Sequence, residues 1–208
     1  MALPIPIDNR TSMTGPTFDY PKQWCWTGEK FFRASELGLF DHKKRIELIN
    51  GNVYAHVDLM GTQHAAAVSM LHDELSRIAK PDFIVRAQLP AIISDDSVPS
   101  PDMCVVPLRT DFYANAHPNA SEIVLVVEIA DSTVAFDRSA KALLYGSHGI
   151  REYWIVNLPD RRLEVFQKND AELGYLQVTI YKTDECVSVL DEAGFVDVKD
   201  LLPEPINI

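Results

Sequence analysis

The chain has 208 residues, of which 47% are hydrophobic and 24% charged, and this balance is typical of a soluble globular protein with a sizeable core. Its 30 acidic residues outnumber its 19 basic ones, so the formal net charge is −11. That charge argues against broad, non-specific binding to nucleic acid, but a local basic rim around an acidic, metal-binding centre remains compatible with it.

The cysteines and the hydropathy pattern indicate a cytoplasmic protein. The three cysteines are far apart and form no CxxC pair, which disfavours both a disulfide framework and a zinc knuckle and fits a reducing compartment. The N-terminus has no basic segment followed by an apolar one, and no apolar run approaches the roughly 18 residues of a membrane span. We therefore expect no signal peptide and no contact with a membrane.

The first segments of the chain predict an arm followed by a helix and a hairpin. Residues 1–22 carry four prolines among polar residues and predict a poorly ordered N-terminal arm, which leaves residues 23–208 as a single domain. A short helix is expected from Thr27, its cap, to Leu37. In the segment 45–56, Asn50-Gly51 between two β-type runs is typical of a hairpin with a type I′ turn. Spacing alone places Glu47 on the solvated face of that hairpin.

The next segment predicts a long helix and two short strands. Apolar residues recur at helical spacing from Thr62 to Lys80, and His64 lies at the N-terminal end of their stripe. Taken by itself, His64 is more typical of a packed or hydrogen-bonded histidine than of a metal ligand. Strands are expected over 83–87 and 89–93.

A buried strand and the helix after it carry the most informative pattern. Residues 123–129 are all apolar except Glu128, which predicts a strand covered on both faces. A carboxylate in such a strand costs several kcal/mol unless it is paired, protonated or bound to a cation. A helix of about residues 137–146 follows, and Lys141 lies on its apolar stripe. The alternative for Lys141 is an exposed i,i+4 pair with Asp137, worth only about 0.3–0.5 kcal/mol.

Further strands are expected before and after this pair of elements. Met103–Val106 is a strand with Asp102 at its start, where the aspartate could also cap a turn. Strands over 152–157 and 162–167 form a hairpin around the turn 158–161, and 175–181 alternates like a half-buried strand. A last strand and a helical tail over 197–202 are expected to close the sheet.

The chemistry that these elements carry is acidic. The chain has no GxxxxGK[ST] loop, GxGxxG fingerprint, HExxH helix or GxSxG elbow. The candidate catalytic side chains that remain are Asp102, Glu128 and Lys141. Two neighbouring carboxylates raise each other's pKa unless a cation lies between them, and hard oxygen ligands select Mg²⁺ or Mn²⁺ over zinc. Such an ion can polarise a phosphoryl oxygen, and the lysine can hold the attacking water or the developing charge.

A Pro-Asp dipeptide at 101–102 is followed, after a gap of 25 residues, by a glutamate near the end of an apolar strand. In this pattern the sequence resembles the PD-(D/E)XK phosphodiesterase superfamily. Over roughly Trp26 to Leu202 the chain more closely resembles the Uma family of restriction-endonuclease-like proteins. The segments that match in order and spacing are RIELINGNV (45–53), GTQH (61–64), PDMCVV (101–106), LVVEIADST (125–133), FDRSAK (136–141), YGSHGIREYWIVNL (145–158) and RRLEVF (161–166).

This resemblance implies an α/β fold with a restriction-endonuclease-like core, in which helices flank a mixed sheet. It implies that Asp102 and Glu128 bind Mg²⁺ or Mn²⁺, with the Ile129 carbonyl as a third ligand. The sequence departs from the superfamily pattern at Ala130, where a lysine is usual, and the Uma-type pattern supplies Lys141 from the next helix instead. The resemblance also makes two further residues candidates for the edge of the site, Glu47 for a second ion or a metal-bound water and His64 for phosphate or a carboxylate.

The sequence thus predicts a metal-dependent endonuclease that cleaves DNA. The rival hypothesis is a non-catalytic module that keeps the nuclease fold for binding or assembly, for instance as a homodimer. The net charge of −11 favours the rival, because basic clusters are few: Lys43-Lys44-Arg45 and Arg161-Arg162. Hydrolysis of a smaller phosphate ester is a third hypothesis, which the sequence does not separate from the first.

Overall fold

A computed structural model describes residues 23–40, 45–55 and 61–205. The expected arm (1–22) and the lysines of the basic cluster at 43–45 lie outside these residues. The centre of the fold is a mixed sheet of six strands in the order β3-β4-β5-β6-β7-β8. Its strands are β3 (Phe83–Ala87), β4 (Met103–Pro107), β5 (Leu125–Ala130), β6 (Glu152–Asn157), β7 (Arg162–Asp170) and β8 (Gly174–Lys182). Only β5 and β6 are parallel, because a helical crossover joins them.

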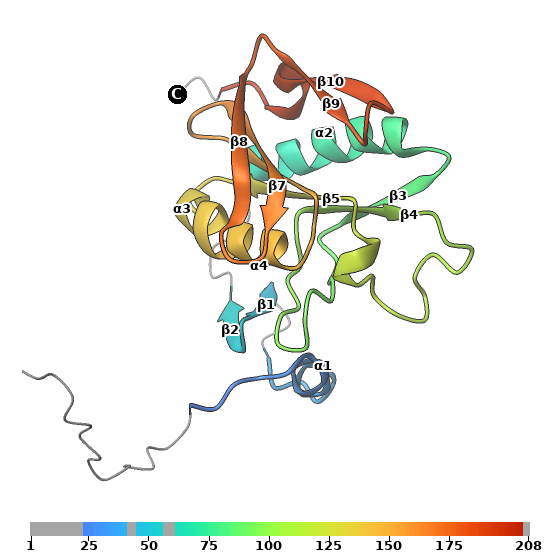
Figure 1. Ribbon diagram of the computed structural model, residues 1–208, viewed down its shortest axis with the longest axis vertical. Coiled ribbons are helices and arrows are strands. Elements are labelled where there is room, and N and C mark those ends of the chain that lie inside the picture. The colour runs from blue at the N-terminus through green and yellow to red at the C-terminus, as the bar shows by residue number, and fades with distance from the viewer. Residues whose placement is uncertain (1–22, 41–44, 56–60, 206–208) are drawn as a thin grey trace, which may run out of the picture.

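Helices cover both faces of this sheet, which confirms the predicted fold class (Figure 1). One face packs against α2 (Thr62–Ala79) and the C-terminal elements around it. The other face packs against one helical segment made of α3 (Val134–Phe136), a π-helical turn η2 (Asp137–Lys141) and α4 (Ala142–Ser147). Each β5 side chain is buried, as its apolar run predicted. No helix in the described ranges is long and apolar enough to cross a membrane.

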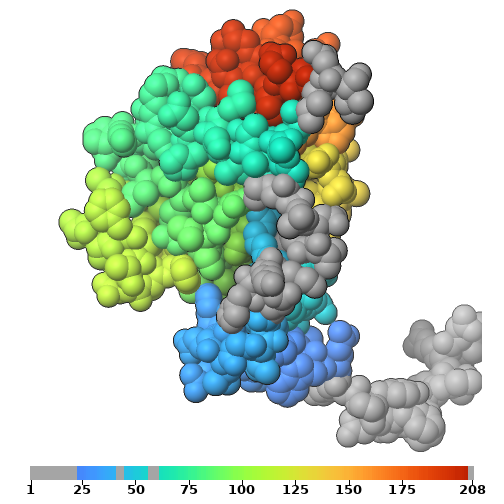
Figure 2. All heavy atoms as spheres, turned by 180° about the vertical axis from the view of Figure 1, so that it is seen from behind, coloured from blue at the N-terminus to red at the C-terminus, as the bar shows by residue number. Residues whose placement is uncertain are grey.

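A smaller unit packs against one end of this core. It contains α1 (Gly28–Glu36) and the hairpin of β1 (Ile46–Ile49) and β2 (Asn52–Ala55), and in Figure 2 these blue residues form the lower end of the molecule. Thr27 caps α1 by accepting a hydrogen bond from the Lys30 amide, as expected. Asn50 and Gly51 have φ angles of 49° and 71°, the left-handed values that a type I′ turn requires. This turn confirms the predicted hairpin.

Three sequence-based expectations about the elements were wrong. Residues 89–93 form no strand, because Pro90 lacks the N–H that a ladder needs, and only isolated bridges occur there. The helix expected at 137 begins at Val134. The last strand does not close the main sheet: β10 (Gly194–Asp197) pairs with β9 (Cys186–Val189) in a separate ribbon, before the short helix η3 (Val198–Leu201). A further short helix, η1 (Ala120–Glu122), precedes β5.

A buried carboxylate on β7 ties the hairpin β6–β7 to the helical segment. Glu164 accepts hydrogen bonds from Arg138, from Asn157 Nδ2 at 2.9 Å and from Arg162 Nε at 3.0 Å. Burial opposes ionisation of this carboxyl group, but the three donors outweigh burial and lower its pKa to about 2. The ionised form is therefore favoured in the folded protein.

We expect this group to govern part of the acid stability. A lowered pKa stabilises the fold fully above the unfolded value of 4.5, and the contribution disappears as pH falls towards about 2. Glu164→Gln should therefore lower the unfolding free energy by about 2–3 kcal/mol at neutral pH and by much less near pH 2. Urea unfolding at several pH values measures this difference. The same change at the exposed Glu172 is the control, and a loss for Glu164→Gln that is independent of pH would contradict the assignment.

Candidate active site

Strand register brings the two predicted acids together. Met103 pairs with Val127 in the antiparallel ladder of β4 and β5, so continuing the register by one residue places Asp102 opposite Glu128. Opposed residues in antiparallel strands point to the same face with their Cβ atoms about 4.5–5.5 Å apart. Both side chains are buried, with exposed fractions of 1% and 2%.

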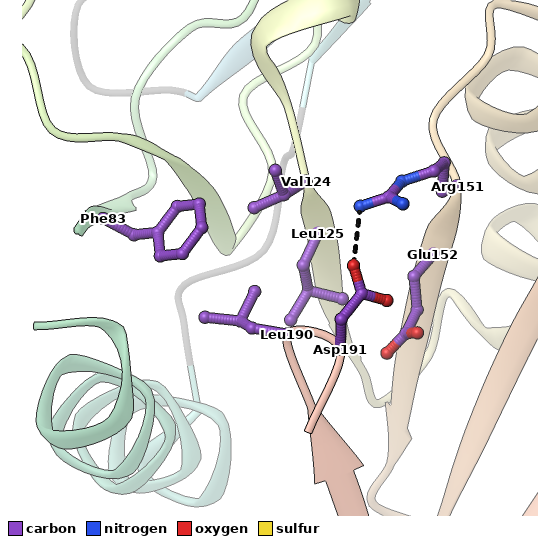
Figure 3. Close-up of a pocket in the computed structure, with 7 residues that line it drawn as sticks. All are labelled: Phe83, Val124, Leu125, Arg151, Glu152, Leu190 and Asp191. Atoms are coloured by element: carbon purple, nitrogen blue, oxygen red, sulfur yellow. Dashed lines mark hydrogen bonds and ion pairs between the residues drawn. The ribbon is translucent and has the colours of Figure 1, made fainter. Parts of the chain in front are cut away.

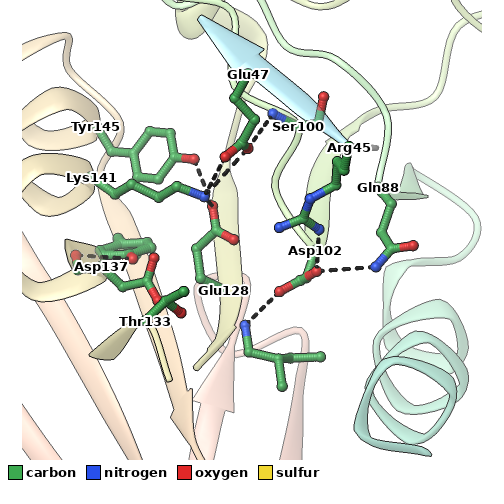
Figure 4. Close-up of polar contacts among 12 residues, drawn as sticks. Arg45, Glu47, Gln88, Ser100, Asp102, Glu128, Thr133, Asp137, Lys141 and Tyr145 are labelled. Carbon is green, nitrogen blue, oxygen red and sulfur yellow. Dashed lines mark hydrogen bonds and ion pairs between the residues drawn. The ribbon is translucent and has the colours of Figure 1, made fainter. Parts of the chain in front are cut away.

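Lys141 reaches the same place from the helical segment that packs against this face of the sheet, at the left of Figure 4. Its Nζ lies 2.8 Å from Glu128 Oε1 and 3.3 Å from Glu47 Oε2, and its side chain is 1% exposed. The prediction that Lys141 points inward is confirmed. The alternative pairing with Asp137 is not the main contact, because the Asp137 carboxylate instead accepts a hydrogen bond from Thr133 Oγ1 at 2.6 Å.

Glu47 is buried, so its predicted place on a solvated hairpin face was wrong. The reason is that β1 bridges to the segment before β4 through reciprocal hydrogen bonds between Leu48 and Val98. The bridge holds the hairpin against that segment, where Glu47 Oε1 accepts a hydrogen bond from the Ser100 amide at 2.8 Å, and Lys141 contacts Glu47 from the helical segment. Glu47 is therefore positioned to hold Lys141 from the side opposite Glu128.

Asp102 is surrounded by donors. Its Oδ1 lies 2.8 Å from Arg45 Nη1, 3.2 Å from His64 Nε2 and 3.2 Å from Gln88 Nε2. Its Oδ2 accepts a hydrogen bond from the Ile129 amide at 2.8 Å. His64 thus contacts a carboxylate, one of the two contacts predicted for it, while the Ile129 carbonyl as a metal ligand stays a prediction. Arg45 and His64 are partly exposed, with side-chain exposures of 24% and 16%, whereas the Asp102 side chain is 2% exposed.

The electrostatics of the two acids differ because their partners differ. Burial opposes ionisation of Asp102, but the hydrogen bond with His64 and the charge of Arg45 hold its pKa well below the usual range. Burial raises the pKa of Glu128, and Asp102 adds to this rise while Lys141, which lies 2.8 Å away, opposes it. Burial would also lower the pKa of Lys141, but Glu128 and Glu47 together raise it above the usual value, so the amine stays protonated.

The donor chemistry fits a hard divalent cation. Three carboxylates (Glu47, Asp102 and Glu128) face two permanent cations (Arg45 and Lys141) in the described part of the site, which leaves an acidic surplus. No group of three or more His, Cys, Asp or Glu side chains is already arranged to hold a metal within the described ranges. Mg²⁺, however, needs only one or two carboxylates because it retains several waters.

Four residues that the sequence-based site omitted complete it. Tyr145 donates its hydroxyl to Glu128 Oε1 at 2.8 Å, and its position one helical turn after Lys141 was a usable signal. Arg45 directly precedes β1 and had no such signal, because its contact with Asp102 spans 57 residues of sequence. Gln88 and Ser100 had none, because both lie in irregular segments that only the folded chain brings near Asp102 and Glu47.

A small pocket elsewhere does not belong to this site (Figure 3). It lies at the beginning of β5 and β6, between Phe83, Leu125 and Leu190, and an Arg151–Asp191 ion pair of 3.1 Å flanks it. Glu128 lies towards the other end of β5. The buried polar cluster is therefore the candidate active site.

Comparisons with known proteins identify the family and the fold of the chain. The sequence model of the Uma2 family, described as "Putative restriction endonuclease", matches residues 29–198 and confirms the predicted resemblance. A crystal structure of a "putative nuclease belonging to DUF820" from Anabaena variabilis superposes with a TM-score of 0.63 at 18% identity, over 85% of this chain and 97% of that one. At that identity the likeness shows the fold alone. No curated protein matches the chain.

Proposed function

Because the chain belongs to the Uma2 family of restriction-endonuclease-like proteins, we propose that it is an endonuclease that hydrolyses phosphodiester bonds in DNA with Mg²⁺ or Mn²⁺. One observation carries this proposal. The protonated amine of Lys141 is buried between Glu47 and Glu128, on the face of the sheet to which the Asp102 side chain also points. Burying charged groups costs desolvation free energy, and clusters of buried ionisable side chains occur preferentially at functional sites.

Asp102 and Glu128, with the Ile129 carbonyl, are the residues that would hold the ion. A divalent ion bound there supplies polarisation of a phosphoryl oxygen and a more acidic water. Lys141 acts as a cation and hydrogen-bond donor and not as a base, because its raised pKa keeps it protonated at neutral pH. It orients Glu128 and can stabilise negative charge that develops on the phosphate. Glu47 and Tyr145 position Lys141 and Glu128.

Arg45 and His64 would face the incoming substrate, because both contact Asp102 and both are partly exposed. In the structure, the Arg45 guanidinium provides the positive charge next to Asp102. A divalent ion that binds Asp102 must therefore compete with it, and Arg45 is then free to contact a phosphate.

We expect Arg45→Met to tighten Mn²⁺ binding by about tenfold or more, because a close charge pair near a protein surface interacts by up to about 4 kcal/mol. Isothermal titration calorimetry with Mn²⁺ measures this directly. Arg151→Met is the matched control, since it makes the same change of charge in an exposed ion pair with Asp191. A weaker or unchanged affinity in Arg45→Met would show that the guanidinium does not compete with the ion.

The proposed function is tested by incubating the purified full chain with supercoiled plasmid and with bis-p-nitrophenyl phosphate, each with Mg²⁺, Mn²⁺ or a chelator. We expect nicked and linear plasmid only with the metals. Cleavage of the small ester alone would favour the smaller substrate class. No cleavage with either metal at any pH would contradict the proposal.

The second candidate function is a non-catalytic binding or assembly module. It is favoured by the three donors on Asp102 Oδ1, which resemble a structural ion-pair cluster, and by the net charge of −11. A thermal-shift experiment with Mn²⁺ discriminates the two candidates. A metal that binds only the folded state at about 100 times its Kd adds roughly 2.7 kcal/mol of stability, whereas the module should show no shift.

A further inference from the structure

The last strand of the main sheet has an open edge. β8 is nine residues long and, among the strands of the described ranges, pairs only with β7. No backbone hydrogen bond from another segment of the described chain reaches its outer side. Natural proteins usually protect such an edge with a short strand, a proline, a bulge or an inward-pointing charge. Between Gly174 and Tyr181, β8 has no proline and no charged residue.

One face of this edge strand is apolar and exposed. Leu176, Val178 and Ile180 alternate along β8 with exposed fractions of 61%, 49% and 49%. The exposed side chains of Leu173 and Leu143 extend the patch. Leu143 lies close to the start of β8, because a Cβ added to Gly174 would come within 2.9 Å of the Leu143 Cα. Contiguous apolar patches on a protein surface mark sites of association.

We propose that a second copy of this chain pairs with β8 in antiparallel orientation, with a two-fold axis at Gln177. In this register Leu176 lies opposite Val178 of the second copy, and the same contact is repeated across the axis. Lys182, at the end of the strand, then lies next to the turn of the other copy that carries Glu172. The alternative axis at Val178 would bring Asp184 to that turn instead, so the charges favour the axis at Gln177.

The two open edges satisfy each other's backbone groups, and the six-stranded sheets become one continuous sheet across the dimer. An antiparallel two-fold pairing places each side chain of one strand opposite a side chain on the same face of the other strand. The exposed apolar face of one β8 therefore continues into the same face of the second β8. The inference depends on the fold and surface alone, so it stands or fails independently of the proposed nuclease activity.

The first experiment is analytical ultracentrifugation of the full chain over a range of concentrations. We expect a species of twice the chain mass of 23.4 kDa. Val178→Lys should convert it to a folded monomer, because this side chain is half exposed and next to the axis. The matched control is Leu108→Lys, another exposed apolar residue far from β8 along the chain, which should remain dimeric. A wild-type monomer at all concentrations, or a Val178→Lys dimer, would overturn the proposal.

A cross-linking experiment tests the register. In a Cys25→Ser/Cys186→Ser background, which removes the two exposed thiols, Gln177→Cys should form an intermolecular disulfide under mild oxidation because both copies of residue 177 meet at the axis. Thr179→Cys in the same background should not, since its two copies are separated by four residues along the strands. Equal cross-linking of both variants would refute this register.

Discussion

Lys141→Met is expected to reduce metal-dependent DNA cleavage by about a thousandfold or more and to lower the unfolding free energy by about 3–5 kcal/mol. The loss of activity follows from removing the donor that stabilises developing phosphate charge. The loss of stability follows from leaving Glu47 and Glu128 buried without the amine that lies 3.3 Å and 2.8 Å from them. Urea unfolding and plasmid cleavage measure the two effects separately.

A second substitution separates the catalytic role of Lys141 from its structural role. In Lys141→Met/Glu128→Gln the buried charge on Glu128 is gone, so much of the lost stability should return while cleavage stays absent. Glu128→Gln alone completes the double-mutant cycle. Recovery of cleavage together with stability would mean that Lys141 acts only by holding the fold together.

Asp102→Asn is expected to abolish the stabilisation of the protein by Mn²⁺ and to remove cleavage with it. The amide keeps the shape of the side chain and can still accept the hydrogen bond from the Ile129 amide, but it lacks the charge that attracts a divalent ion. At about 100 times its Kd for the wild type, Mn²⁺ should add roughly 2.7 kcal/mol to the wild type and almost nothing to the variant.

The control for this result is Asp197→Asn, which makes the same change at an exposed carboxylate paired only with Lys199 in the described structure. It should keep the full Mn²⁺ shift. If Asp102→Asn keeps the shift as well, the ion binds elsewhere and the assignment of Asp102 as a ligand is wrong. Because the variant also loses its ion pair with Arg45, its stability without metal must be measured first.

Several parts of the site could be predicted because local pattern determines them. The apolar run before Glu128 requires a strand buried on both faces, so that carboxylate had to be internal. Helical periodicity places Lys141 on the same stripe as Leu144 and Tyr145, and all three are buried. Asn50-Gly51 defines a turn through its own backbone preference.

Other parts could not be predicted, because they depend on contacts between segments distant in sequence. Glu47 is buried because the hairpin bridges to the segment before β4 and because Lys141 reaches it from the helical segment. Arg45 meets Asp102 across 57 residues of sequence, and no local pattern indicates that contact. The strand expected at 89–93 is different in kind, because Pro90 and its missing N–H are visible in the sequence itself.

Local pattern was enough to predict the types of most elements, the inward direction of Glu128 and Lys141, and the resemblance to a nuclease family. Only the tertiary structure decided that Asp102 and Glu128 stand opposite each other, that Glu47 and Tyr145 hold Lys141 and Glu128, and that Arg45 supplies positive charge beside Asp102. The physical reason is that side-chain periodicity records which face of an element is buried, whereas the register between elements is set by the packing of the whole core.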